Sequence, residues 1–498
     1  MTPYRQFIFL LRAAFALAMI GLAYLMPTGE SLWIDETTTV MYASEPTLPD
    51  LAARLASDTG SETQMPLGML VAWAWAHLGI ASEWGLRALN ILWVIVAAGA
   101  LSLTGRRLRL PLLPLWFCAQ PFLWFYANEF RPYALQIAGA AWCLHGLVAC
   151  LQERGRGAAW AWSLALGGFV MTGASLLGAI PLALVVLIAG GSFFAWRSLP
   201  EPRAWLPLGL GLLLQLLLGV HDAAALVRGA GGSRVWEIGL LNPVFALYEL
   251  LGFLGLGPAR LEIRDTAKAG APALLALFRE SVFGVGVLGL VYLVLLLPLR
   301  KRIEDSRRGL LAAVAAVAAG SPLMLLAAAW LAGWPFWGRH LAPVLPFFTV
   351  LIAWMTDRFT RTCPFRWLGQ LVPVLLALLL LISSFTLRLT PRHRKDDYRK
   401  AAALAVEAAE QGQIVWWAAG LETARYYGVP FNETLESGGI IYPASSFEAG
   451  TGGMAAPARV FTSKPDLFDR DGRLALWLQT HQYRAIETFP GFIVWGRH

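Results

Sequence analysis

Long apolar runs, separated by short polar connectors, dominate the first 387 residues of the chain. They lack the strict alternation of apolar and polar residues that marks a membrane-spanning strand. The pattern therefore predicts a polytopic α-helical membrane protein of about eleven spans. The runs that are long enough to cross a bilayer as helices lie at 7–26, 86–104, 110–127, 131–151, 158–174, 175–195, 204–220, 281–299, 309–331, 341–356 and 367–387.

The pattern changes near residue 388, where charged residues, Gly and Pro become common. The segments "AAALAVEAAEQG", "LETARYYG" and "LALWLQTHQ" are typical of helices, and "QIVWWAA", "ARVFTS" and "GFIVWGR" are typical of strands. We expect residues 388–498 to form a small extracytoplasmic α/β domain. Residues 1–387 would then form the transmembrane domain, whose first outer loop, 27–85, carries interfacial helices.

The composition agrees with a membrane protein, since 57% of the residues are hydrophobic and only 14% are charged. Soluble domains carry about 25% charged residues. The first run, 7–26, has no clear A-x-A cleavage site and is long enough to span, which favours a retained helix over a signal peptide. The four cysteines fall in or near apolar runs without metal-type spacing, so they indicate neither a disulfide framework nor a metal site.

Charge sets the predicted topology. If 65–81 does not span, one side receives the connectors 105–109, 152–157, 196–203, 300–308 and 357–366, with fifteen Lys and Arg against five Asp and Glu. The loop 27–83 carries eight acids and a single base. The positive-inside rule then places the N-terminus in the cytoplasm and the C-terminal domain outside, with 65–81 as a re-entrant or interfacial helix. The net charge of +8 is thus a topology signal and does not indicate nucleic-acid binding.

Four polar clusters fall on the same outer side: Asp35-Glu36, "NEFRPYALQ" (128–136), "WPFWGRHLAPVLP" (334–346) and the C-terminal domain. The spans themselves contain few ionisable residues, whereas a transporter places such groups near the midplane. This favours an enzyme with its site at the outer interface. A lipid or sugar transporter or flippase is the alternative from another class. A catalytically inactive scaffold is a third, against which Asp35 and Arg339 argue.

These motifs, in this order and on one side, resemble the GT-C membrane glycosyltransferases over nearly the whole chain. The most similar branch contains the protein O-mannosyltransferases and the aminoarabinose and galacturonic acid transferases of lipid A. The matching features are the early "DE" pair, "E-x-R-P-Y-A-L" from Glu129, "R-H-L-x-P-x-L-P" from Arg339, and "D-Y-R" at 397–399. One departure is that the family often has "H-P-P-L" where this chain has "QMPL" at 64–67.

The resemblance implies an inverting transfer of a sugar from a polyprenyl-phosphate donor to a lipid A, glycan or protein acceptor. It also implies a location in the bacterial inner membrane, with the site at the periplasmic face. A carboxylate must deprotonate the acceptor hydroxyl, and the leaving phosphate needs cations to neutralise its charge. The resemblance gives the first role to Asp35, with Glu36 as a second catalytic acid. The residues that it implies for substrate binding are Glu129, Arg131, Tyr133, Arg339 and His340, with Arg131 and Arg339 on the phosphate.

Each of these residues also has an explanation that involves no catalysis or substrate binding. Asp35 and Glu36 are also what a solvated loop after a helix would contain. Glu129 and Arg131 suit an ion pair at a helix start, and Arg339 suits a membrane anchor. Glu36 and Glu129 would alternatively hold a divalent cation with the donor phosphate. The charged residues at 396–399 are interpreted as a juxtamembrane hinge. His340 is interpreted as a histidine at the membrane interface.

Overall fold

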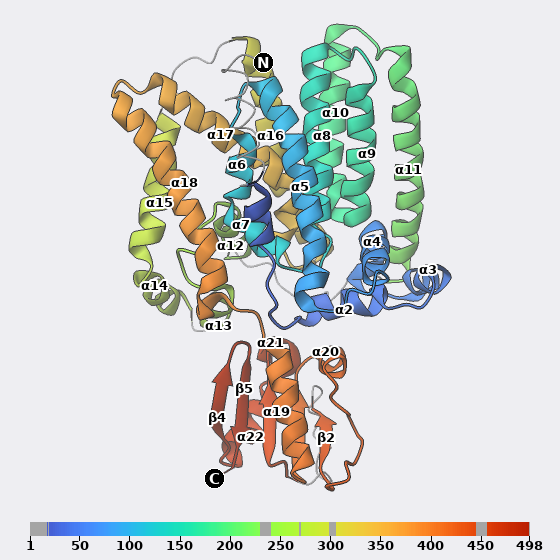
Figure 1. The fold of residues 1–498 in the computed structure, drawn as a ribbon, viewed down its shortest axis with the longest axis vertical. Coiled ribbons are helices and arrows are strands. Elements are labelled where there is room, and N and C mark those ends of the chain that lie inside the picture. Colours follow the sequence, from blue (N-terminus) through green and yellow to red (C-terminus); the bar gives the residue numbers. More distant parts are fainter. Residues whose placement is uncertain are drawn as a thin grey trace. The chain divides into compact units, whose positions relative to one another are not determined.

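The computed structural model describes residues 17, 19–229, 241–267, 270–297, 305–444 and 456–497. The chain forms two compact units, which Figure 1 draws as ribbons. Unit 1 comprises Met1–Thr28 and Tyr42–Leu389, and unit 2 comprises Gly29–Met41 and Thr390–His498. The sequence-based division placed 27–85 with the transmembrane domain, whereas the contacts group Gly29–Met41 with the C-terminal segment.

Unit 1 is a helical membrane domain, as predicted. Among the described residues, seven helical segments are long and apolar enough to cross a membrane. They are α5 (Glu83–Leu108), α8 (Tyr133–Glu153), η2 (Leu176–Gly178) with α10 (Ala179–Trp196), α11 (Pro202–Val227), α16 (Asp305–Ala332), η4 (Gly338–Val344) with α17 (Leu345–Thr362), and α18 (Arg366–Leu389). The pair α14 (Ala271–Arg279) and α15 (Val282–Leu296), bent by 87°, makes an eighth if it is counted as one span. The predicted span 7–26 lies largely outside the described residues.

The apolar run 110–127 is not one span, which corrects the prediction. It forms two short helices, α6 (Leu113–Cys118) and α7 (Pro121–Ala127). Pro121 stands at the start of α7, where its missing N–H and its ring prevent α6 from continuing. The break places Tyr126 and the turn that follows it in the interior of unit 1, where both are buried.

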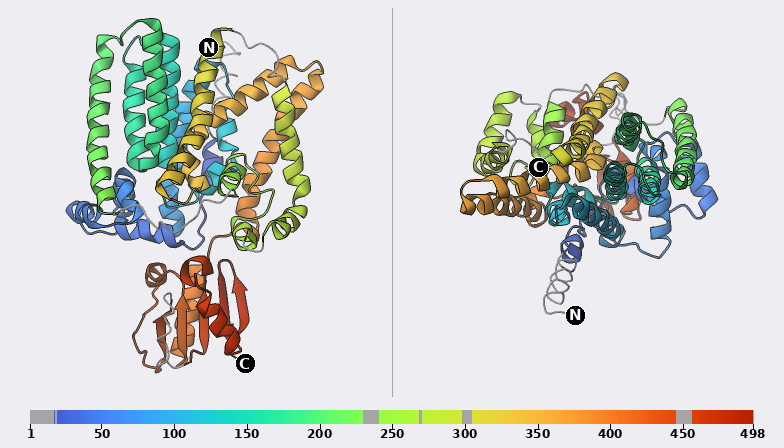
Figure 2. Two further views of the ribbon diagram at one scale, coloured as in Figure 1. Left: turned by 180° about the vertical axis from the view of Figure 1, so that it is seen from behind. Right: turned by 90° about the horizontal axis from the view of Figure 1, so that it is seen from above.

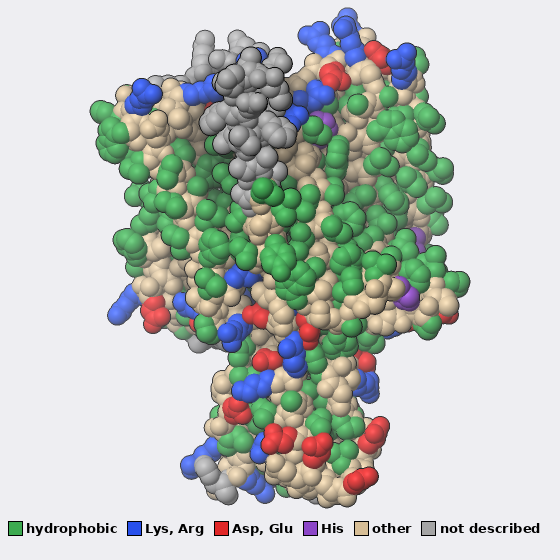
Figure 3. Space-filling view, in the orientation of Figure 1, with side chains coloured by type: hydrophobic (Ala, Val, Ile, Leu, Met, Phe, Trp, Pro, Cys, Tyr) green, Lys and Arg blue, Asp and Glu red, His purple; other side chains and the backbone are tan. Residues whose placement is uncertain are grey.

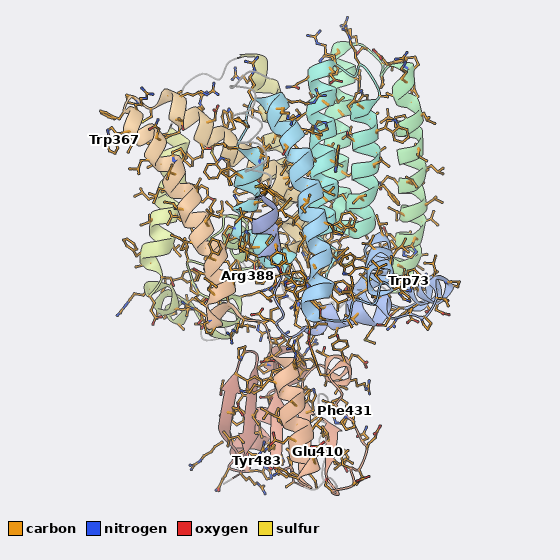
Figure 4. The ribbon with its side chains drawn as sticks, in the orientation of Figure 1. Trp73, Trp367, Arg388, Glu410, Phe431 and Tyr483 are labelled. Carbon is orange, nitrogen blue, oxygen red and sulfur yellow. The ribbon has the colours of Figure 1, made fainter. Side chains whose placement is uncertain are left out.

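The run 65–81 is also too short to span as one helix. Its helix, α4 (Pro66–Ala76), has eleven residues and rises about 16 Å, roughly half of the hydrocarbon core. It lies near α3 (Leu48–Ser57) at one end of unit 1, and Figure 4 marks Trp73 on it. The Trp73 indole donates a hydrogen bond to the Glu45 carbonyl at 2.8 Å, which ties α4 to the preceding loop.

Helix α8 is packed closely against α9 (Ala159–Ala174). A Cβ added at Gly139 would lie 2.5 Å from the Met171 nitrogen, and one at Gly146 would lie 2.8 Å from the Trp160 carbonyl oxygen. Small residues at such contacts let membrane helices approach through their backbones. The packing buries most of α8 and holds the polar turn at its first residue in place.

The surface of unit 1 carries a belt of hydrophobic side chains with charged side chains at both ends (Figure 3). Helices α11 and α18 lie at opposite sides of the unit (Figures 1 and 2). Both expose large apolar side chains, including Leu206 and Leu371. Such exposure would be costly in water and is expected of a surface that faces lipid.

Unit 2 contains a five-stranded sheet in the order β2-β1-β3-β5-β4. Strand β1 (Ile414–Ala418) pairs in parallel with β2 (Ile440–Pro443) and β3 (Arg459–Thr462). Strand β5 (Phe492–Gly496) runs antiparallel to β3 and to β4 (Arg484–Phe489). The helices are α19 (Tyr398–Glu410), α20 (Leu421–Tyr426), α21 (Pro465–Phe468) and α22 (Arg473–Thr480). The three predicted strands and three predicted helices are confirmed, while β2 and β4 were not predicted.

Candidate functional site

The turn before α8 carries an ion pair that is almost fully buried. Arg131 Nη1 lies 2.5 Å from Glu62 Oε1, with 2% and 6% of the two side chains exposed. Glu62 belongs to a short helix, η1 (Ser61–Gln64). The Asn90 amide of α5 fixes the same turn, because it donates to the carbonyls of Ala127 at 3.0 Å and Glu129 at 2.6 Å. Arg131 is thus held rigidly, and its partner is an acid 69 residues earlier in the chain.

Helix α11 reaches the same region. Nε2 of His221 lies 2.8 Å from the Thr63 carbonyl oxygen, which binds η1 to the end of α11. Asp222, the next residue, is also buried. Polar groups from η1, from the turn before α8 and from α11 therefore lie close together.

A second polar cluster surrounds Glu249, the penultimate residue of α12 (Leu241–Leu250). The Tyr126 hydroxyl donates to Glu249 Oε2 at 2.7 Å, and Arg260 Nε lies 4.0 Å from Oε1. Arg260 begins α13 (Arg260–Ala267), and its guanidinium lies over the rings of Phe125 and Trp337, 5.8 and 5.7 Å from their centroids. The cluster joins α7, α12 and α13 to the loop before η4.

Arg339 and His340 follow Trp337 in the first turn of η4, and both are half-buried. Gly338 leaves no room for a side chain, because a Cβ there would overlap Glu249 Oε2 at 1.5 Å. The charge of Arg339 acts on both Glu249 and Arg260. Nδ1 of His340 accepts the Trp337 N–H at 3.3 Å and closes the turn. We call Arg260, Arg339, Glu249 and Tyr126 the arginine cluster.

The electrostatics of Glu249 reflect two opposing causes. Burial raises its pKa above the ordinary value, while Arg260, the Tyr126 hydroxyl and Arg339 act to lower it. Burial disfavours the charged carboxylate, and the two cations favour it. The net effect leaves Glu249 easier to protonate than an exposed glutamate.

An apolar pocket of about 450 Å³ begins next to this cluster. Leu251 and Phe253, which follow α12 directly, line it, and the Tyr292 hydroxyl donates to the Leu251 carbonyl at 3.0 Å. Its other walls come from α15 and α17. The full lining is Leu251, Phe253, Gly289, Tyr292, Leu293, Leu296, Phe348 and Met355.

In unit 2, Asp35 and Glu36 stand in the first turn of α2 (Ile34–Ala43), where the helix dipole favours acids. Glu36 is fully buried, and its Oε2 accepts hydrogen bonds from Lys395 Nζ and from the Trp33 N–H, both at 3.3 Å. Asp35 is only half-buried. The two adjacent acids thus have different surroundings, and Asp35 is the more accessible one.

The "D-Y-R" segment at 397–399 binds Gly29–Met41 to the rest of unit 2. Asp397 caps α19, the Tyr398 hydroxyl accepts the Gly420 N–H at 3.2 Å, and Arg399 Nη2 donates to the Gly29 carbonyl at 3.0 Å. Asp396 forms a buried ion pair of 2.5 Å with Lys464. These contacts hold 396–399 against the rest of unit 2, and the hinge at these residues stays a prediction.

Among the described residues, no three His, Cys, Asp or Glu side chains come together as a metal site. Glu36 is engaged by Lys395, a cation of the chain itself. With Glu36 paired to Lys395, these donors do not fit a resident divalent cation.

The structure brings forward three residues that the sequence reading did not single out: Glu62, Glu249 and Arg260. Glu62 was one of eight acids in a loop, with no local signal to distinguish it. Glu249 had a usable signal, because it is the one acid in the apolar run 243–256. An ionisable residue within such a run is by default a candidate functional group.

Neither a family model nor a curated protein matches the chain. Two solved structures are similar over almost its full length. ArnT from Cupriavidus metallidurans bound to undecaprenyl phosphate is 14% identical, with a TM-score of 0.47 over 98% of this chain and 97% of that one. The same protein in the apo state is 14% identical, with a TM-score of 0.48 over 99% and 98%.

Proposed function

We propose that this protein is an inverting glycosyltransferase that moves a sugar from a polyprenyl-phosphate donor to an acceptor at the periplasmic face of the bacterial inner membrane. The observation that carries the proposal is the arginine cluster beside the apolar pocket. A lipid-linked sugar phosphate needs cations for its phosphate and an apolar surface for its tail. Unit 1 provides both within a few residues of each other.

The donor phosphate is assigned to Arg260 and Arg339. Arginine presents a planar fork of donors that matches phosphate oxygens. The phosphate gains negative charge as its bond to the sugar breaks, so these cations stabilise the transition state more than the bound donor. Arg131, predicted to share the phosphate, is already paired with Glu62, and we assign it to the support of the turn that carries Glu129 and Tyr133.

The first isoprene units of the donor are assigned to the pocket lined by Leu251, Phe253 and Tyr292. The lining is apolar, and its first residue is two positions after Glu249. Burial of hydrocarbon contributes about 0.8 kcal/mol for each CH₂ group. A few isoprene units in the pocket would thus add affinity without any polar contact.

Asp35 is our candidate for the general base that removes the proton from the acceptor hydroxyl. Of the two adjacent acids, Glu36 is buried against Lys395, while Asp35 is partly accessible. The leaving phosphate departs as a stable anion and requires no acid. Glu36 is then a second carboxylate next to the base. It forms an ion pair with Lys395, and Asp35 accepts the proton.

The test uses the purified protein in nanodiscs with a labelled undecaprenyl-phosphate-linked sugar and a membrane extract as acceptor source. The changes Arg339→Lys and Arg260→Lys keep the charge but lose the fork, so release of undecaprenyl phosphate should slow about tenfold or more. The control is Arg361→Lys, an exposed residue of α17 that pairs with Asp357 at 2.8 Å. Unchanged turnover in both cluster variants would contradict the assignment. Movement of the intact lipid across the bilayer without release would indicate the transporter alternative.

A further inference from the structure

Glu249 occupies the position that a bound anion would need. Its Oε1 faces the Arg260 guanidinium at 4.0 Å, and its Oε2 accepts the Tyr126 hydroxyl. Only 1% of the carboxyl side chain is exposed, whereas 23% of the Arg260 side chain is. The arginine can therefore meet a ligand from its open side, while its inner side is held by an acid of the protein.

The charges around Glu249 come from every element packed against it. Tyr126 of α7 is neutral, Arg260 of α13 and Arg339 of the η4 turn are cations, and Glu129 acts on Arg260 and on Tyr126. His340 lies next to Arg339 in the same turn. With both glutamates ionised, the two arginines are already balanced. A further anion placed among buried groups would then leave uncompensated negative charge, which is costly.

We propose that Glu249 is the resident counter-ion of the donor site, and that Glu249 binds one proton when the lipid phosphate binds Arg260 from its open side. This inference rests on the proposed function, since it needs the phosphate at the arginine cluster. The proton comes from solvent and converts the carboxylate to the neutral acid. The Tyr126 hydroxyl can then accept where it donated before, so neither buried group loses its hydrogen bond.

Protonation of Glu249 is also consistent with the change in phosphate charge during sugar transfer. The donor is a phosphodiester with one negative charge, and the product is a phosphomonoester whose second pKa is near 6. The phosphate therefore gains charge when the bond to the sugar breaks, and the acceptor proton goes to the base. A neutral Glu249 no longer offsets the charge of Arg260, so Arg260 can stabilise the charge that the phosphate gains. Ionisation of Glu249 after the reaction would help to expel the product.

The ease of this protonation follows from the surroundings of Glu249. Its burial raises the pKa of the carboxyl, and a phosphate brought close to it would raise this pKa further, which favours uptake of a proton. The exposed part of Arg260 shows that solvent reaches this cluster.

The first test measures binding of undecaprenyl phosphate to the full chain in nanodiscs by calorimetry. Titrations at one pH well above the second pKa of the phosphate, in two buffers of different ionisation enthalpy, give the number of protons that the protein takes up. We expect net uptake with the wild-type protein. This measurement needs no variant and stands even if substitutions at Glu249 fail to fold.

The second test compares the pH dependence of binding between wild type and Glu249→Gln. Titration of the lipid phosphate is common to both, so the difference isolates Glu249. As the pH rises, the affinity of wild type relative to the variant should fall by up to about tenfold for each pH unit. This is the linkage expected when binding takes up one proton. The control is Glu153→Gln, which removes a partner of Arg107 at 2.7 Å in a half-exposed connector and should leave the slope unchanged.

The possible results distinguish failure of the Glu249 proposal from failure of the proposed function. Binding that depends on Arg260 but takes up no proton, with equal slopes in wild type and Glu249→Gln, overturns the inference and leaves the proposed function standing. Binding that is absent, or that does not respond to Arg260→Lys, overturns the proposed function and the inference together.

Discussion

At the scale of single residues, the buried charge of Arg131 requires a counter-ion close to it. Its partner Glu62 is 2.5 Å away, and both side chains are almost fully buried. The change Glu62→Gln would leave the guanidinium without its counter-ion and should lower the free energy of unfolding by about 3–5 kcal/mol. Thermal unfolding in detergent would measure the loss.

The matched control for this prediction is Glu45→Gln. Glu45 pairs with Arg54 at 2.6 Å, but about a quarter of each side chain is exposed. Such a pair contributes about 0–1 kcal/mol. Equal losses for the two variants would show that burial does not distinguish the pairs.

A substitution at Asp35 tests its proposed role as the general base. Asp35→Asn keeps the size of the side chain and removes its basicity, so the rate of transfer should fall by about 10²–10⁴-fold. The control is Asp50→Asn, at an exposed first-turn acid of α3. A folded Asp35→Asn protein that transfers sugar at the wild-type rate would remove Asp35 from the mechanism.

At the scale of elements, Tyr42 and Asp58 join the chain segments before and after α3 within unit 1. The Tyr42 hydroxyl donates to Asp58 Oδ2 at 2.6 Å, and the backbone N–H groups of Thr59 and Gly60 donate to Oδ1. The Tyr42 hydroxyl is the main cause that holds the pKa of Asp58 below its ordinary value. A lowered folded pKa stabilises the protein above the unfolded value near 4, and this stabilisation is lost as the pH falls through the folded pKa.

Tyr42→Phe should therefore lower stability at neutral pH, and the difference from wild type should shrink below about pH 4. Thermal unfolding in detergent between pH 3 and pH 7 would show converging curves. Curves that stay parallel over this range would mean that the hydrogen bond does not act through the Asp58 carboxylate.

At the scale of the whole molecule, the predicted topology can be tested by cysteine labelling in spheroplasts. The background would be Cys363→Ser, because Cys363 is the one native cysteine that is not buried. In that background, Ser82→Cys and Asp471→Cys should react with a membrane-impermeant maleimide, and Arg106→Cys should react only after the cells are opened. The physical reason is the excess of Lys and Arg in the connectors on the side of Arg106. Labelling of Ser82→Cys only in opened cells would mean that 65–81 crosses the membrane.

The sequence by itself determined the features that depend on neighbouring residues. The apolar runs predicted most of the membrane helices, and the local patterns after residue 388 predicted β1, β3 and β5 with α19, α20 and α22. A span or a strand is visible locally because its length and period are properties of consecutive residues. Even the break in 110–127 had a local cause in Pro121, which the sequence reading passed over.

Only the tertiary structure decided which distant polar groups meet. It paired Arg131 with Glu62, surrounded Glu249 with Tyr126 and Arg260, and grouped Gly29–Met41 with the C-terminal segment. A buried charge needs a partner, but the pattern around it does not say which acid or base in the chain will come near. That choice is made by the packing of helices and loops far apart in sequence, so the arginine cluster could be recognised only from the fold.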